Sequence, residues 1–197
     1  YGPALEQGFG PATVLDDVPV SYPNPAGKPY EPRNYDGRWR GLITMREAVK
    51  HSVNIPAVKT MEMIGVNTGW EFGKRLGLPL KDNDRNLSLS LGGMSHGFSP
   101  LEVASAYGAF ANKGIRVEPY AISKILDNEG NVIWEAKPRQ HVVMSEETAY
   151  LMTDMLRSVV QSGTGTRAKM NRPVAGKTGT TQLPDLLSDR KAVLFQF

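Results

Sequence analysis

The sequence predicts a mixed fold of helices and strands (α/β, α+β), in which a sheet is flanked by helices. Two kinds of pattern carry this prediction. Helix-start signals precede apolar periodic stretches at several points along the chain, and β-branched or alternating segments with turn residues follow them. The 197 residues include 40% hydrophobic and 22% charged side chains, which is enough apolar material for one domain with its own core.

The N-terminal part of the chain changes character after its first turn. Residues 1–8 are typical of the end of a helix that Gly8 closes, so we expect that the chain was cut from a longer one. Residues 9–41 are rich in Pro, Gly, Asn and Asp, and they predict a long ordered loop with little regular structure.

Several helices are predicted after this loop. Thr44 and Glu47 form a capping box for a helix that runs to about His51. A second helix is predicted to begin at Ile55, with a proline near its first position, and to end at Gly65. Capping signals and terminal glycines predict further helices over residues 68–77, 99–114 and 145–163.

Strand signals lie between the last two of these helices, and again after the final one. Residues 117–126 and 131–134 are separated by the turn at 127–130, and they therefore predict a β-hairpin. Residues 177–181 combine β-branched side chains with glycine, which favours an edge strand that a ligand backbone can approach closely.

Composition excludes several classes of function. The net charge of +3 comes without a long run of Lys or Arg, so we expect no nucleic-acid partner. The absence of cysteine excludes disulfides and cysteine nucleophiles. His51, His96 and His141 lie far apart and outside any H-E-x-x-H pattern, so we expect neither a metal nor another cofactor. No apolar run approaches the ~20 residues of a membrane helix.

Two short motifs predict parts of a serine acyl-transfer site. Ser52-Val53-Asn54 and Lys177-Thr178-Gly179 stand in the order of the second and third motifs of enzymes that carry S-x-x-K, S-D-N and K-T-G. We predict Ser52, Asn54 and Lys177 as catalytic residues. Ser52 offers a hydroxyl that can relay a proton, Asn54 an amide for a substrate carbonyl, and Lys177 a positive charge.

The residues after Lys177 are predicted to bind substrate. The Thr178 hydroxyl can hold a carboxylate, Gly179 lets a substrate backbone lie against the strand, and the Thr180 N–H offers one oxyanion donor. Each motif alone also has a structural interpretation. Asn54 is a good N-cap for the helix beginning at Ile55, and Lys-Thr-Gly is compatible with an exposed strand end and a turn glycine.

Longer stretches around these motifs resemble the transpeptidase domain of class A (bifunctional) penicillin-binding proteins over roughly residues 1–185. The resemblance rests on residues 34–37 with 46–58, 91–107 and 175–181. It implies the penicillin-binding protein and serine β-lactamase-like fold, present here over 1–197 as a partial domain, incomplete at both ends. It also implies a serine that is acylated by peptidoglycan stem peptides ending in D-Ala-D-Ala, and by β-lactam antibiotics.

The parent protein is then expected to be membrane-anchored, usually with a glycosyltransferase domain, and to work on the extracytoplasmic face of the bacterial membrane. The family's S-x-x-K motif, with the nucleophile, is expected upstream of Tyr1. Residues 166–169 and 188–191 fit [ST]-x-x-K by letter only, because both follow Ser-x-Asn. Residues 186–197 match the family poorly.

The resemblance thus implies a chain that is inactive alone, unless the missing N-terminal part of the same domain completes it. A β-lactam-binding sensor and a β-lactamase-like hydrolase remain alternatives.

Overall fold

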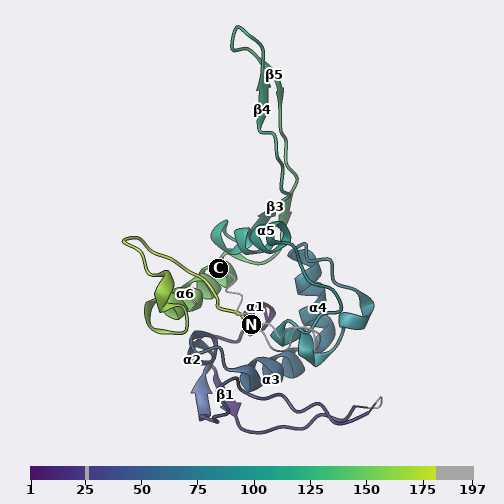
Figure 1. Cartoon of the computed structure of the whole chain (residues 1–197), viewed down its shortest axis with the longest axis vertical. Helices are drawn as coiled ribbons and strands as arrows, with labels where there is room; N and C mark the ends of the chain where they lie inside the picture. Colours follow the sequence, from purple (N-terminus) through teal and green to yellow (C-terminus); the bar gives the residue numbers. More distant parts are fainter. Residues whose placement is uncertain (25–26, 181–197) are drawn as a thin grey trace, which may run out of the picture.

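The computed structural model describes residues 1–24 and 27–180. In this part of the chain the order of elements is mixed, with six α-helices, six short strands and three short 3-10 helices (Figure 1). The predicted mixed class is confirmed. None of the helices in the described part is long and apolar enough to cross a membrane.

The larger core forms around the long helix α6 (Glu146–Ser162). Its buried residues Met155, Leu156 and Val159 recur at helical spacing and form one apolar face. This face packs against α2 (Met45–Lys50) and α1 (Gly2–Glu6), and α3 (Asn54–Ile64) completes the cluster. The two helices that flank Ser52-Val53-Asn54, α2 and α3, therefore share one core with α6.

A second apolar cluster joins the helices of the other half. Ala106 and Ala109 of α5 (Pro100–Ala111) are buried against Val143 and Met144. Helix α4 (Val66–Arg75) adds Phe72 to this cluster. The short 3-10 helices η1 (Asp82–Asp84), η2 (Leu87–Leu91) and η3 (Thr166–Ala168) lie in the connections.

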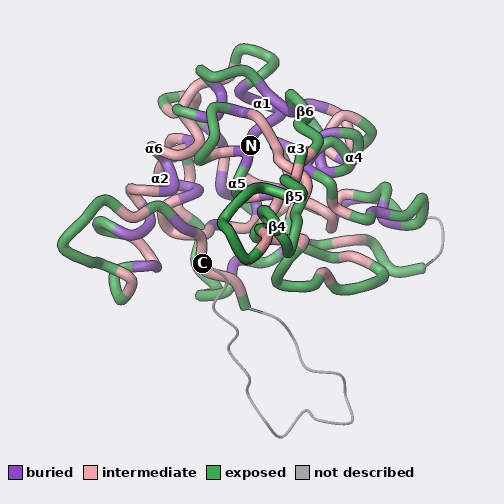
Figure 2. Tube along the Cα trace, turned by 90° about the horizontal axis from the view of Figure 1, so that it is seen from above, coloured by how far each residue is buried: buried purple, intermediate pink, exposed green. Residues whose placement is uncertain are grey.

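The strands of the described part form three separate antiparallel pairs instead of the single sheet that was predicted. Strand β1 (Val14–Asp17) pairs with β2 (Gly41–Thr44), and β3 (Ile115–Val117) pairs with β6 (Gln140–Val142). Strand β4 (Lys124–Leu126) and β5 (Val132–Glu135) form the predicted hairpin. This hairpin projects from the body in Figure 1, and its residues are exposed in Figure 2.

Most predicted helices are present, but one begins at a different place. Thr44, Ser99 and Ser145 cap α2, α5 and α6 as predicted. Helix α4 begins at Val66, so the helix start predicted at residue 68 from a capping signal is wrong. Gly65, at φ 85°, ends α3 and directly precedes α4, and this left-handed conformation turns the chain without a separate cap.

Two further expectations about strands are corrected. The range 9–41 contains β1 and an isolated backbone β-bridge between Tyr22 and Tyr30, whose rings also stack, so it holds more regular structure than its composition predicted. Residues 173–180 form no strand, although their composition favours one. A strand requires a partner, and no described strand pairs with these residues. Residues 181 and 186–197 lie outside the described part.

Candidate active site

Ser52 occupies a strained turn between two helices. Helix α2 ends at Lys50, and Ser52 adopts a left-handed backbone with φ 53°. The N–H of Ser52 donates to the Val49 carbonyl at 3.1 Å, and the N–H of Val53 donates to the Ala48 carbonyl at 2.9 Å. A left-handed residue other than glycine is uncommon and persists where its surroundings fix it. The turn therefore holds Ser52 in one conformation.

Lys177 lies directly on Ser52 although the two residues are 125 positions apart in the sequence. Its Nζ donates to Ser52 Oγ at 2.6 Å and to its neighbour's carbonyl, at Thr178, at 2.9 Å. Burial lowers the pKa of Lys177 to about 8, because the charged amine loses hydration. The amine is therefore still mostly charged at pH 7, with a hydroxyl in contact.

A contact between two threonine hydroxyls connects the Lys177 segment, through Thr164, to the end of α2. Thr178 Oγ1 lies 2.6 Å from Thr164 Oγ1. The N–H of Thr164 donates to the Lys50 carbonyl at 3.2 Å, two residues before Ser52. The N–H of Gly176 donates to the Leu156 carbonyl of α6 at 3.3 Å. These contacts fix the third motif against α6 and against the end of α2, the helix that precedes the second motif.

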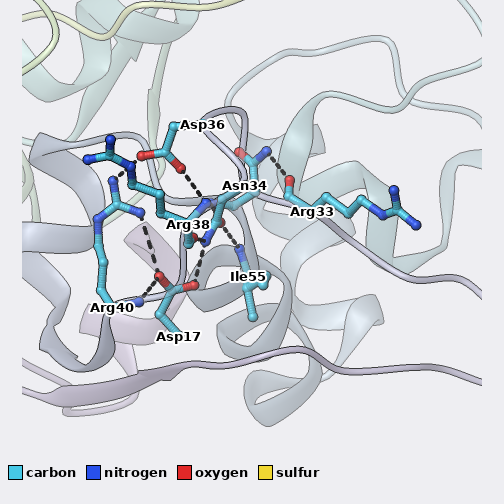
Figure 3. A network of polar contacts seen from close by, with 8 residues as sticks. Asp17, Arg33, Asn34, Asp36, Arg38, Arg40 and Ile55 are labelled. Carbon is cyan, nitrogen blue, oxygen red and sulfur yellow. Dashed lines mark hydrogen bonds and ion pairs between the residues drawn. The ribbon is translucent and has the colours of Figure 1, made fainter.

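Asn54 is the first residue of α3, and it does not cap that helix. The N-cap position is Val53, whose side chain makes no capping bond. The N–H groups of Asn54 and Ile55 instead donate to Asn34 Oδ1 at 3.0 and 3.2 Å. Asn54 Nδ2 donates to the Arg33 carbonyl at 2.7 Å. The structural interpretation of Asn54 as an N-cap is therefore wrong, because Asn34 supplies the cap (Figure 3).

The structure thus brings together Ser52, Lys177 and Thr178, with Asn54 one residue beyond the turn. Gly179 has open space where a side chain would project, and Thr180 is exposed. The roles predicted for these two residues remain predictions. Among the residues that the structure describes, no group of three or more His, Asp or Glu side chains is arranged to hold a metal ion. The 188–191 match to [ST]-x-x-K lies outside the described residues.

Sequence reasoning missed Asn34 and Thr164 as parts of this arrangement. Both act through contacts between segments distant in sequence, and no local spacing reveals such contacts. Asn34 did belong to a stretch, 34–37, that carried the family resemblance, and this was the available signal. The groups that the structure brings together are the Lys177 amine, with its lowered pKa, the Ser52 hydroxyl on it and the hydroxyl of the adjacent Thr178, while the Asn54 amide donates to the Arg33 carbonyl. They can bind an anionic end and relay a proton.

Comparison with known proteins supports one family. A family model described as the penicillin-binding protein transpeptidase domain matches residues 1–193. Penicillin-binding protein 1F of Bacillus subtilis (strain 168) is 42% identical over 182 residues, covering 92% of this chain. Penicillin-binding protein 1A of Clostridium novyi (strain NT) is 38% identical and covers 86% of the chain. The chain spans 24% and 21% of the lengths of these two relatives.

Solved structures agree with this relationship. Penicillin-binding protein 1A from Haemophilus influenzae matches with a TM-score of 0.80 at 30% identity, covering 92% of this chain and 33% of that one. Penicillin-binding protein A from Mycobacterium tuberculosis, in an imipenem acyl-enzyme complex, matches with a TM-score of 0.79 at 21% identity, over 93% of this chain and 46% of that one. The second match shows the fold alone. Since the family model covers nearly the whole chain, this chain belongs to the penicillin-binding protein transpeptidase domain family.

Proposed function

We propose that this chain forms part of a peptidoglycan D,D-transpeptidase that works through a serine acyl-enzyme. The observation that carries the proposal is the contact of 2.6 Å between Lys177 Nζ and Ser52 Oγ. It brings the two predicted motifs into contact although they are 125 positions apart in the sequence. A pair of chance motifs, each serving only as a cap or a turn, has no reason to meet in this way.

The proposed reaction has two steps. A serine attacks the carbonyl of the penultimate D-Ala of a stem peptide, an ester forms, and the terminal D-Ala leaves with a proton added to its amine. An acceptor amine then attacks the ester, which forms the cross-link and regenerates the serine. Ser52 relays the proton to the first leaving group, and Lys177 with Thr178 holds the terminal carboxylate.

Asn54 and Thr180 have the remaining roles. Asn54 Nδ2 carries two hydrogens, and one is used by the Arg33 carbonyl, so the other can donate to a substrate amide carbonyl. The Thr180 N–H provides one oxyanion donor beside Gly179. β-Lactams present a carboxylate and a reactive carbonyl in a similar arrangement, and we propose that they acylate the same serine; penicillin-binding protein A of M. tuberculosis forms an acyl-enzyme complex with the β-lactam imipenem.

The attacking serine is proposed to lie in a segment outside residues 1–197. The serine or threonine residues ahead of Ser52 are Thr13, Ser21 and Thr44, and none has lysine three positions later. The full-length protein is proposed to be anchored in the bacterial membrane, with a glycosyltransferase domain, and to act on the extracytoplasmic face.

Fluorescent penicillin tests this function. The full-length protein should be labelled covalently, and the 197-residue chain alone should not be. Lys177→Ala and Asn54→Ala should each raise the acylation barrier by ~2–4 kcal/mol, the range for removing one electrostatic donor. Lys169→Ala, an exposed lysine near the same segment, is the matched control and should leave acylation unchanged.

Three outcomes would contradict the proposal. Labelling of a residue within 1–197 would show that the nucleophile is misplaced. Unchanged acylation in both variants would return the two motifs to purely structural roles. Rapid release of the acyl group would indicate a β-lactamase-like hydrolase instead of a transpeptidase.

A further inference from the structure

The side chain of Asn34 is buried between the loop and the start of α3, with only 5% of the residue exposed. Its amide makes four hydrogen bonds (Figure 3). Oδ1 accepts from the N–H groups of Asn54 and Ile55, and Nδ2 donates to Asp17 Oδ1 and the Arg38 carbonyl, both at 2.7 Å. The oxygen faces two donors and the nitrogen faces two acceptors. This arrangement fixes the orientation of the amide and uses its full hydrogen-bonding capacity.

Asp17 anchors Asn34 from the other side. This carboxylate, at the end of β1, is fully buried. Its second oxygen accepts from the backbone N–H of Arg40 at 3.0 Å and lies 3.7 Å from the Arg40 guanidinium. Arg40 also pairs with Asp36 at 2.7 Å. A buried carboxylate with donors on both oxygens holds its partners firmly, so Asn34 is locked to the β1–β2 sheet.

This network ends on Asn54, which the proposed reaction uses. Two adjacent loop residues act on it: Asn34 binds the N–H of Asn54 and Ile55, and the Arg33 carbonyl binds the Asn54 amide. Val53 offers no side-chain cap, so Asn34 is what satisfies the first N–H groups of α3. Without it the helix start would loosen next to the left-handed turn at Ser52. Displacement of reacting groups by about 1 Å is enough to slow a reaction roughly a hundredfold.

We propose that Asn34, held by Asp17, is a positioning residue that fixes Asn54 for acyl transfer. The inference rests on the proposed transpeptidase function and adds the loop before β2 to the site.

An exchange of the two side chains tests the inference in the full-length protein. Asn34→Asp keeps an acceptor for the helix N–H groups, but it removes the donor to Asp17 and places a second carboxylate against the first. Asp17→Asn leaves an amide with one acceptor oxygen, which can face either the Asn34 amide nitrogen or the Arg40 N–H. The NH2 group of the new amide then faces the other donor. The double variant D17N/N34D restores a donor facing an acceptor and removes the like-charge pair. Its remaining losses are the ion pair of position 17 with Arg40 and the bond to the Arg38 carbonyl, which then faces a carboxylate oxygen.

Two measurements separate positioning from stability. The first is the rate of acylation by fluorescent penicillin per active site, with active sites counted from the end-point of labelling. The second is thermal unfolding of the same samples. We expect both single variants to acylate at least about tenfold more slowly per site, and D17N/N34D to return to within about threefold of wild type. In an Asn54→Ala background, Asn34→Asp should slow acylation by less than about twofold further.

Three outcomes would overturn the positioning role of Asn34, and a fourth would contradict the proposed function. Reduced thermal stability with an unchanged rate per site would overturn the positioning role. The same holds if D17N/N34D folds but stays as slow as the single variants, a comparison that stands even where Asn34→Asp alone does not fold. Full additivity with Asn54→Ala would also overturn it. A wild-type protein that is not acylated at all would contradict the proposed function instead.

Discussion

The charge on Lys177 should control acylation between pH 7 and pH 9. Burial lowers the pKa of this amine from 10.5 to about 8. A lysine with a lowered pKa is charged below that value and neutral above it. The charged fraction therefore falls from about 0.9 at pH 7 to about 0.1 at pH 9. If the ammonium holds the carboxylate of the substrate, the second-order rate constant for acylation by a β-lactam should fall about tenfold over this range.

The assay is stopped-flow acylation of the full-length protein by a fluorescent penicillin below saturation, at half-unit pH steps. Lys177→Arg is the matched control, because its guanidinium stays charged throughout this range. The arginine variant should be slower at pH 7, because its planar guanidinium differs in shape from the lysine amine that contacts Ser52. Its rate should carry no titration from position 177. The ratio of wild type to Lys177→Arg therefore isolates Lys177 from other titrating groups.

A ratio that stays constant between pH 7 and pH 9 would refute the reasoning. A ratio that rises with pH would refute it in a different way. It would show that the neutral amine is the active form and takes a proton from Ser52, in place of a cation that holds the carboxylate.

Two predictions concern stability, and urea unfolding measures both. A Cβ on Gly163 would collide with the Lys50 carbonyl beside the Ser52 turn, so Gly163→Ala should lower the free energy of unfolding by at least about 2 kcal/mol and slow acylation. Gly108→Ala, in an open position of α5, is its control and should raise stability by ~0.5–1 kcal/mol; equal effects of the two changes would contradict this account. Ser99→Ala removes the cap of α5 and should cost about 1 kcal/mol, and a neutral result would show that the cap is not needed.

The helices that could be predicted from sequence are those whose start signal is local. Thr44, Ser99 and Ser145 each accept a hydrogen bond from a backbone N–H three residues later, so the whole signal lies within one turn. The hairpin of β4 and β5 is local in the same sense, because its turn lies between its strands. These elements need no information from the rest of the chain.

The errors share a different cause. Strand β1 pairs with β2, and the intervening composition gives no sign of this partner. The segment at 173–180 has the composition of a strand but no described partner. Asn54 is of a residue type that often caps helices, yet Asn34, 20 positions earlier, accepts the hydrogen bonds of the first N–H groups of α3. For β1 and for Asn54 a tertiary contact decided the outcome, and local propensity is weaker than such contacts.

In the candidate site, too, local sequence predicts some features and tertiary contacts decide others. Chain order and residue type predicted Ser52 and Lys177 as site residues, but only the fold shows why Ser52 can keep a left-handed backbone. That conformation costs of order 1 kcal/mol or more, so it needs support from outside the turn. Thr164 binds the carbonyl two residues before it, Lys177 binds its hydroxyl, and Asn34 fixes the helix after it. The geometry of the second motif therefore depends on contacts made by the third. A change at Lys177 acts on the geometry of Ser52 as well as on the charge, and effects at the two positions should not add.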